Sequence, residues 1–132
     1  MVEMRVSALQ VVIFVIALFL AISHAFYVQF ISYSLSIGGY FLVATILFAA
    51  GGFAALTSGK LFKPAIIGLF VLSLIDNLLI LVTATTPTPL SGGQAFGFST
   101  DWMPPGNVQV FVAQVVLMVL TGYVLLAKRK AA

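Results

Sequence analysis

The run PAIIGLFVLSLIDNLLILVT, residues 64–83, has the length and apolar character of a membrane-spanning helix, yet it carries Asp76 and Asn77 near its middle. About 20 mainly apolar residues are enough to cross the hydrocarbon core of a bilayer. An ionisable side chain at that depth costs roughly 2.5–3.5 kcal/mol on insertion scales. Asp76 therefore indicates a compensating partner, a protonated carboxyl or a functional role.

The composition places the whole chain in a membrane. Of its 132 residues, 62% are hydrophobic and 7% are charged, which is too little polar surface for a soluble protein of this size. We expect a single membrane domain, residues 1–132, in contact with the lipid bilayer. The net charge of +3 is read as a sign of membrane orientation, and we expect no nucleic-acid partner. The absence of cysteine excludes disulfides and thiolate metal sites.

Three further apolar runs flank the first one. They predict helices at residues 6–31, 40–57 and 108–127, in addition to 64–83. Turn-forming Ser and Gly residues at 32–39 separate the first two helices, and the Pro- and Gly-rich segment 84–107 forms a long loop before the last. The predicted fold class is an all-α integral membrane bundle of four transmembrane helices with a long outer loop between the third and fourth.

The basic residues predict an orientation. If four helices alternate, all six fall on one side of the membrane: Arg5, Lys60, Lys63, Lys128, Arg129 and Lys130. Cytoplasmic loops carry an excess of Lys and Arg. We therefore expect both termini in the cytoplasm, the 84–107 loop outside, and the plasma membrane as the location.

Small residues occur at four-residue spacing in the second predicted helix, as Ala50 with Ala54 and Gly51 with Ala55. Such spacing lets helix backbones approach closely. Two interpretations are open, packing within the bundle and, less favoured, a dimerisation face.

Each predicted helix carries a polar residue at a similar depth. At about 1.5 Å per residue, His24, Thr45, Asp76 and Gln114 lie about seven residues, roughly 10 Å, below the outer ends of their helices. Residues three or four positions apart lie on the same face of a helix, so further polar residues lie beside His24 and Asp76. The predicted intramembrane polar layer is His24, Thr45, Ser73, Asp76, Asn77 and Gln114, with Ser23 and Tyr27 beside His24.

This layer has three interpretations. The favoured one is structural: a hydrogen-bonded layer that fixes helix register, with Asp76 protonated because burial disfavours its charged form. The second is a proton or ion relay that uses Asp76 and His24, and the third is contact with a neighbouring subunit. A single His cannot provide bis-His haem ligation, and the acidic residues are too dispersed for a usual metal set. We expect no catalytic, cofactor or metal site in this chain.

The outer loop contains apolar side chains among Gly, Pro, Ser and Thr. They are Phe96, Phe98, Trp102 and Met103. Trp102 and Tyr40 are interpreted as interfacial anchors, since aromatic rings favour the headgroup level. The alternative is a partner-docking loop, because long loops without their own secondary structure are usually functional or disordered.

The sequence thus predicts a non-catalytic accessory subunit of a larger, hetero-oligomeric membrane complex. In size and composition the chain is similar to small hydrophobic accessory subunits of respiratory oxidases, which favours an energy-transducing assembly. A haem or a quinone would then belong to partner subunits. The alternative prediction is a small proton-coupled transporter or channel protomer that uses Asp76 and His24. A membrane enzyme acting on a lipid or a quinone is a third hypothesis.

Overall fold

The computed structural model describes residues 7–28, 35–57, 59–87, 93, 95–102 and 105–131. Within these ranges the structure contains four helices and no strand. The helices are α1 (Ala8–Ala25), α2 (Leu35–Ala55), α3 (Phe62–Thr85) and α4 (Asn107–Ala131). All four helices are long and apolar enough to cross a membrane. The predicted fold class, an all-α bundle of four membrane-spanning helices, is confirmed.

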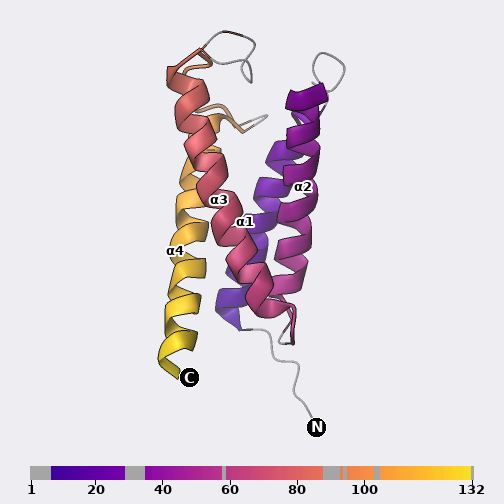
Figure 1. Cartoon of the computed structure of the whole chain (residues 1–132), viewed down its shortest axis with the longest axis vertical. Helices are drawn as coiled ribbons and strands as arrows, with labels where there is room; N and C mark the ends of the chain where they lie inside the picture. The colour runs from indigo at the N-terminus through magenta and orange to yellow at the C-terminus, as the bar shows by residue number, and fades with distance from the viewer. Residues whose placement is uncertain are drawn as a thin grey trace.

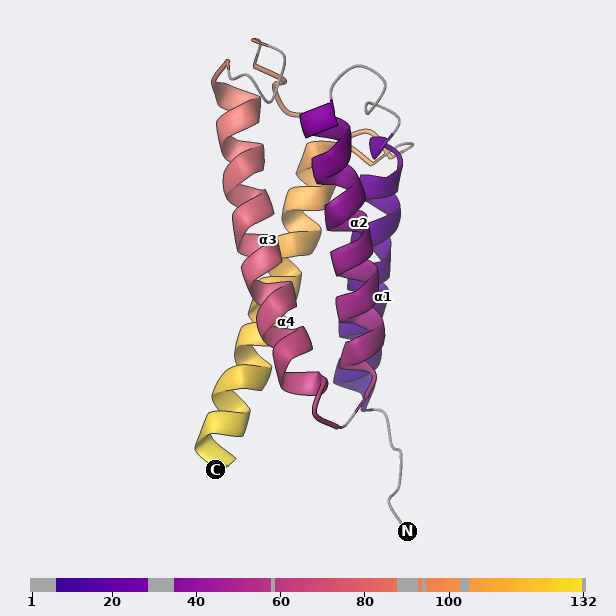
Figure 2. The ribbon, with the colours of Figure 1, turned by 45° about the vertical axis from the view of Figure 1, so that its right-hand side comes forward.

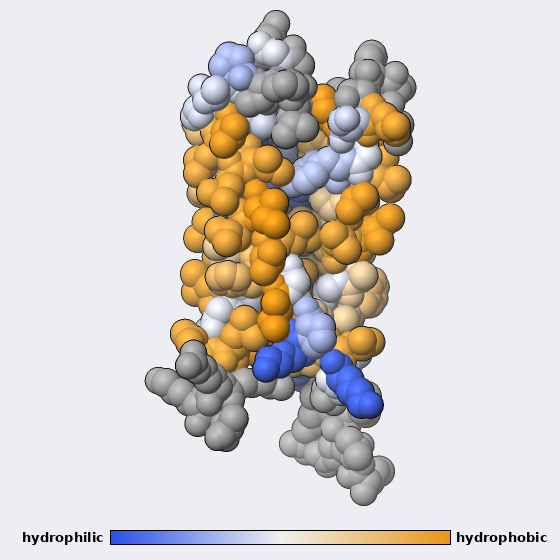
Figure 3. All heavy atoms as spheres, viewed as in Figure 1, coloured by the Kyte–Doolittle hydropathy of each residue, from blue (hydrophilic) through white to orange (hydrophobic). Residues whose placement is uncertain are grey.

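The helices run alternately up and down, and each packs against its neighbours in chain order, with α1 and α4 closing the ring (Figures 1 and 2). We call one end of the bundle the basic end; there α1 and α3 begin, α2 and α4 end, and Lys60 and Lys63 are exposed. The opposite end, where the segment between α3 and α4 lies, is the loop end. Figure 3 shows a mainly apolar belt between the two ends on the face in view.

Two helix boundaries differ clearly from the prediction. α1 ends at Ala25, where the N–H of the capping residue Phe26 bonds to the Ile22 carbonyl. The first helix is therefore shorter than the predicted helix at residues 6–31. α2 begins at Leu35 and includes Gly38 and Gly39, which were predicted to form a turn. In a bilayer an unsatisfied backbone group is costly, so the helix continues through glycines that would end it in water.

A glutamine at the basic end joins the first two helices. Ser7 and Gln10 form a capping box at the start of α1, in which each side chain bonds to the backbone N–H of the other residue, at 3.1 and 2.9 Å. Gln10 Nε2 also donates to the carbonyls of Ala55 and Thr57, at 2.9 and 3.1 Å. One side chain thereby satisfies backbone groups at the start of α1 and the end of α2.

Two small residues of α2, Gly51 and Gly52, pack inside the bundle. A Cβ atom at Gly51 would lie 2.7 Å from Leu69 Cδ2 of α3, and one at Gly52 would lie 3.0 Å from the Ala17 Cβ of α1. These two glycines therefore allow α2 to approach α3 and α1 closely. The interpretation of Gly51 as a packing residue within the bundle is supported, while Gly52 lies outside the spacing pattern.

Candidate functional site

Asp76 lies at the centre of a polar cluster contributed by three helices. Its side chain is buried in α3, and Oδ2 is 3.1 Å from His24 Nε2 of α1. Oδ1 accepts a hydrogen bond from the Tyr40 hydroxyl of α2. His24 is also buried, and Phe48 of α2 packs near it with ring centroids 5.1 Å apart. Asp76 thus joins α1, α2 and α3 through side-chain contacts.

The hydrogen bonds fix the number of protons that the His24–Asp76 pair carries. His24 Nδ1 is 2.7 Å from the Leu20 carbonyl oxygen, which can only accept, so Nδ1 carries a proton. The contact between Nε2 and the carboxyl oxygen needs one more proton, which either His24 or Asp76 carries. In both arrangements the pair has no net charge. A neutral pair is far less costly at membrane depth than a lone carboxylate.

A second polar contact links α3 and α4 beside the first. Gln114 is fully buried and donates from Nε2 to Asn77 Oδ1, while Asn77 Nδ2 lies 3.4 Å from the Phe111 carbonyl. Ser73 Oγ and Gln114 Oε1 are buried and have no hydrogen-bond partner among the described protein groups. Together the two contacts connect all four helices at one level.

Buried apolar side chains, which we call the apolar layer, lie between this level and the basic end. It consists of fully or almost fully buried side chains, one from each helix: Leu20, Phe48, Leu69 and Leu117. Each of them lies closer to the basic end than the polar residue of its own helix. The polar cluster therefore faces apolar side chains on this side.

A cavity lies on the other side of the cluster, toward the loop end. Its volume is about 530 Å³, which falls within the roughly 300–1,000 Å³ of small-molecule sites. A separate, smaller cavity of about 310 Å³ lies near the basic end.

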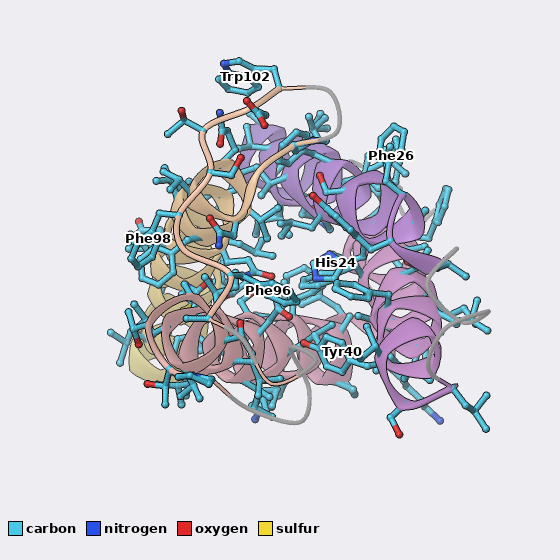
Figure 4. All side chains as sticks on the ribbon, turned by 90° about the horizontal axis from the view of Figure 1, so that it is seen from above. His24, Phe26, Tyr40, Phe96, Phe98 and Trp102 are labelled. Carbon is cyan, nitrogen blue, oxygen red and sulfur yellow. The ribbon has the colours of Figure 1, made fainter. Side chains whose placement is uncertain are left out.

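 The loop-end cavity has a polar floor and apolar walls. His24, Tyr40 and Asp76 line its floor, and Phe41, Ile80 and Val110 are among its apolar walls. Figure 4, which looks down from above, shows His24 and Tyr40 pointing into the space between the helices.

The segment before α4 forms the roof of the loop-end cavity. The N–H groups of Phe96 and Gly97 donate to the carbonyls of Thr83 and Ala84, at 2.8 and 2.9 Å, and so attach the roof to the end of α3. Asn107 at the start of α4 accepts from the Ser99 N–H and donates to the Gly97 carbonyl, at 2.8 and 2.7 Å. The roof is held to α3 and α4 by backbone groups.

Tyr27 attaches the same roof to α1. Its hydroxyl donates to the Pro105 carbonyl at 3.0 Å. Burial raises the pKa of the Tyr27 phenol, and the nearby Asp101 carboxylate raises it further. The hydroxyl therefore keeps its proton, and with it the hydrogen bond to Pro105, beyond the ordinary pH range of a tyrosine.

The structure brings together most of the predicted polar layer. His24 meets Asp76, and Gln114 meets Asn77, while Ser73 is buried one turn below them on α3. Thr45 is the exception, because it is only half-buried and its hydroxyl donates to the Phe41 carbonyl of its own helix. Thr45 is therefore not joined to the other members through its hydroxyl, because a threonine can satisfy that group within the preceding helical turn.

Tyr40 is the site residue that the sequence analysis missed. It was interpreted as an interfacial anchor on the assumption that the second helix begins there, but α2 begins at Leu35 and places Tyr40 within the bundle, against Asp76. The signal that could have found it is its phenol, which needs a hydrogen-bond partner when buried.

The aromatic residues of the loop take different positions. Trp102, Phe98 and Phe96 are all exposed, but Trp102 and Phe98 point away from the bundle, whereas Phe96 lies over its centre and lines the loop-end cavity (Figure 4). Met103 lies outside the described residues.

In comparisons with known proteins, no family model, curated protein or solved structure matches this chain.

Proposed function

We propose that this protein is a non-catalytic accessory subunit of a larger membrane assembly, in which it holds a small, largely apolar molecule in the loop-end cavity. The observation that carries the proposal is the cavity itself, which has apolar walls and a polar floor of His24, Tyr40 and Asp76. This combination is typical of small-molecule sites, where a few polar groups orient a ligand held mainly by apolar contact.

The internal contacts of the floor support binding. His24 and Asp76 form a pair without net charge, and Tyr40 bonds to the same carboxyl group. These groups are held in place before any ligand arrives, so little conformational freedom is lost when one binds.

The exposed aromatic side chains at the loop end support the assembly part of the proposal. Trp102 is 72% exposed and Phe98 is 58% exposed, on a segment that lies beyond the ends of the helices. Aromatic residues are enriched where protein surfaces meet. We propose an energy-transducing assembly of the plasma membrane, with the basic end in the cytoplasm and any haem or quinone chemistry in partner subunits.

Purification in mild detergent followed by native mass spectrometry tests both parts. We expect the wild-type chain to co-purify with another membrane protein and with a small bound molecule. Val110→Phe places a larger side chain in the cavity wall and should remove the small molecule, whereas Val112→Phe changes an exposed position of the same helix and should not. A chain that is stable alone, with neither companion, would contradict the proposal.

A second candidate, a proton-coupled transporter or channel, is favoured by the His24–Asp76 contact and by cavities near both ends of the bundle. The apolar layer between the cavities weighs against an open path. Asp76→Asn removes the titratable carboxyl and should abolish proton-coupled flux in reconstituted vesicles if this candidate is correct. Unchanged flux would dismiss transport, and lost assembly without a flux defect would favour the accessory subunit.

A further inference from the structure

We infer that the molecule held in the loop-end cavity carries a hydroxyl group that donates a hydrogen bond to the cavity floor, as a lipid-soluble phenol or alcohol does. This inference rests on the proposed binding function and names the class of ligand. It follows from the direction of the hydrogen bonds made by the residues that line the cavity.

The lining hydroxyl groups direct their protons at acceptors within the protein. Tyr40 donates to Asp76, and Tyr27 donates to the Pro105 carbonyl. The remaining hydroxyls among the described lining residues do the same: Ser23 donates to Phe19 O, Thr83 to Leu79 O and Ser99 to Asp101 Oδ2, at 2.7, 2.7 and 3.2 Å. A hydroxyl group has a single proton. The protons of these hydroxyl groups are therefore not available to a ligand.

The N–H groups around the cavity are similarly engaged. His24 uses Nδ1 on the Leu20 carbonyl and Nε2 on Asp76. In the roof, the N–H of Gly97 bonds to the Ala84 carbonyl and that of Gly106 to the Asp101 carbonyl, at 2.9 and 2.8 Å. Asn107 uses one of its two amide N–H bonds on Gly97, which leaves one at the roof, away from the floor.

The floor therefore presents acceptors to the ligand. Tyr40 Oη and the Asp76 carboxyl group line the cavity and retain lone pairs after their internal contacts are made. A ligand hydroxyl can donate to them. A ligand ether or carbonyl oxygen would instead place its own lone pairs against theirs, and a buried polar group without a partner is costly.

The apolar walls specify the rest of the ligand. Phe41, Leu79, Ile80 and Val110 line the cavity, whose volume of about 530 Å³ suits a drug-sized apolar body. Two sources share this chemistry, an aromatic hydroxyl such as that of a reduced lipid-soluble electron carrier, and an aliphatic hydroxyl such as that of an isoprenoid alcohol.

Matched probe pairs test the inference on the full chain in lipid nanodiscs. Para-octylphenol and farnesol are each compared with their methyl ethers. In each ether a methyl group replaces the hydroxyl proton, so the oxygen can accept a hydrogen bond but cannot donate one. We expect the hydroxyl compound of at least one pair to bind about tenfold more tightly than its ether in equilibrium dialysis, the size expected for one satisfied buried hydrogen bond. The pair that shows the preference identifies the aromatic or aliphatic source.

Two variants locate the contact. Asp76→Asn introduces an N–H donor into the floor, so the preference for the hydroxyl compound should fall by about threefold or more. Thr85→Val removes a hydroxyl of the same helix that donates to the Leu81 carbonyl and does not line the cavity, and should leave the preference unchanged.

The outcomes separate the inference from the function beneath it. Equal binding of hydroxyl compound and ether, or tighter binding of the ether, overturns the hydroxyl inference and leaves the binding function standing. Failure of all four probes, together with the absence of any co-purified molecule, overturns both.

Discussion

Replacing Asp76 with alanine is expected to lower the free energy of unfolding by about 3–5 kcal/mol, the cost of breaking a buried ionisable pair by removing one partner. The variant leaves the Tyr40 hydroxyl and His24 Nε2 without the carboxyl group that they contact, both beside a cavity at membrane depth. Titration of the detergent-solubilised protein with SDS, followed by circular dichroism, measures the change.

Asp76→Asn is the matched control. The asparagine carbonyl oxygen can still accept from Tyr40, and its amide can donate to His24 Nε2, because His24 Nδ1 already carries the imidazole proton. We expect a change within about 1 kcal/mol. If alanine and asparagine destabilise the protein equally, the hydrogen bonds of the cluster do not hold the three helices together.

Gly52→Leu is expected to destabilise the bundle by about 1–3 kcal/mol, the usual cost of overpacking a core. A Cβ at this position would already lie 3.0 Å from the Ala17 Cβ and 3.7 Å from the Phe14 carbonyl oxygen. Neither of these atoms belongs to a long side chain that could rotate away, so α1 and α2 must separate. The same SDS titration provides the measurement.

Gly68→Leu provides the comparison for Gly52→Leu. Gly68 lies within α3 at an exposed position, and a Cβ there would have nothing within 4 Å. Because leucine favours a helix more than glycine does, we expect this variant to be neutral or slightly stabilising. Similar losses at both positions would show that glycine itself, rather than close packing at Gly52, determines the effect.

Much of the candidate site was predictable from residue type and depth. Asp76, His24, Asn77 and Gln114 are polar residues in apolar runs, and polar groups in a bilayer are expected to find one another in the bundle interior. Their pairing follows from that requirement. Thr45 differs from them because a threonine hydroxyl can bond within its own helix, so its depth carries little information about contacts with other helices.

Tyr40 and the roof were not predictable in this way. The place of Tyr40 depended on where α2 begins, and Gly38 and Gly39 favoured a turn by local rules that the bilayer overrides. The roof depends on backbone bonds such as those from Phe96 and Gly97 to the end of α3. Backbone groups are the same in every residue, so the sequence does not indicate which of them pair across a loop.

The sequence by itself determined that the protein crosses a membrane as four helices, because apolar run length and composition act through the bilayer without regard to which helix packs on which. Only the tertiary structure decided that Asp76 is paired with His24 and Tyr40, and that these residues form the floor of a cavity. The physical reason is that pairing and enclosure depend on the rotation and end points of each helix, which are fixed by contacts between residues far apart in the chain.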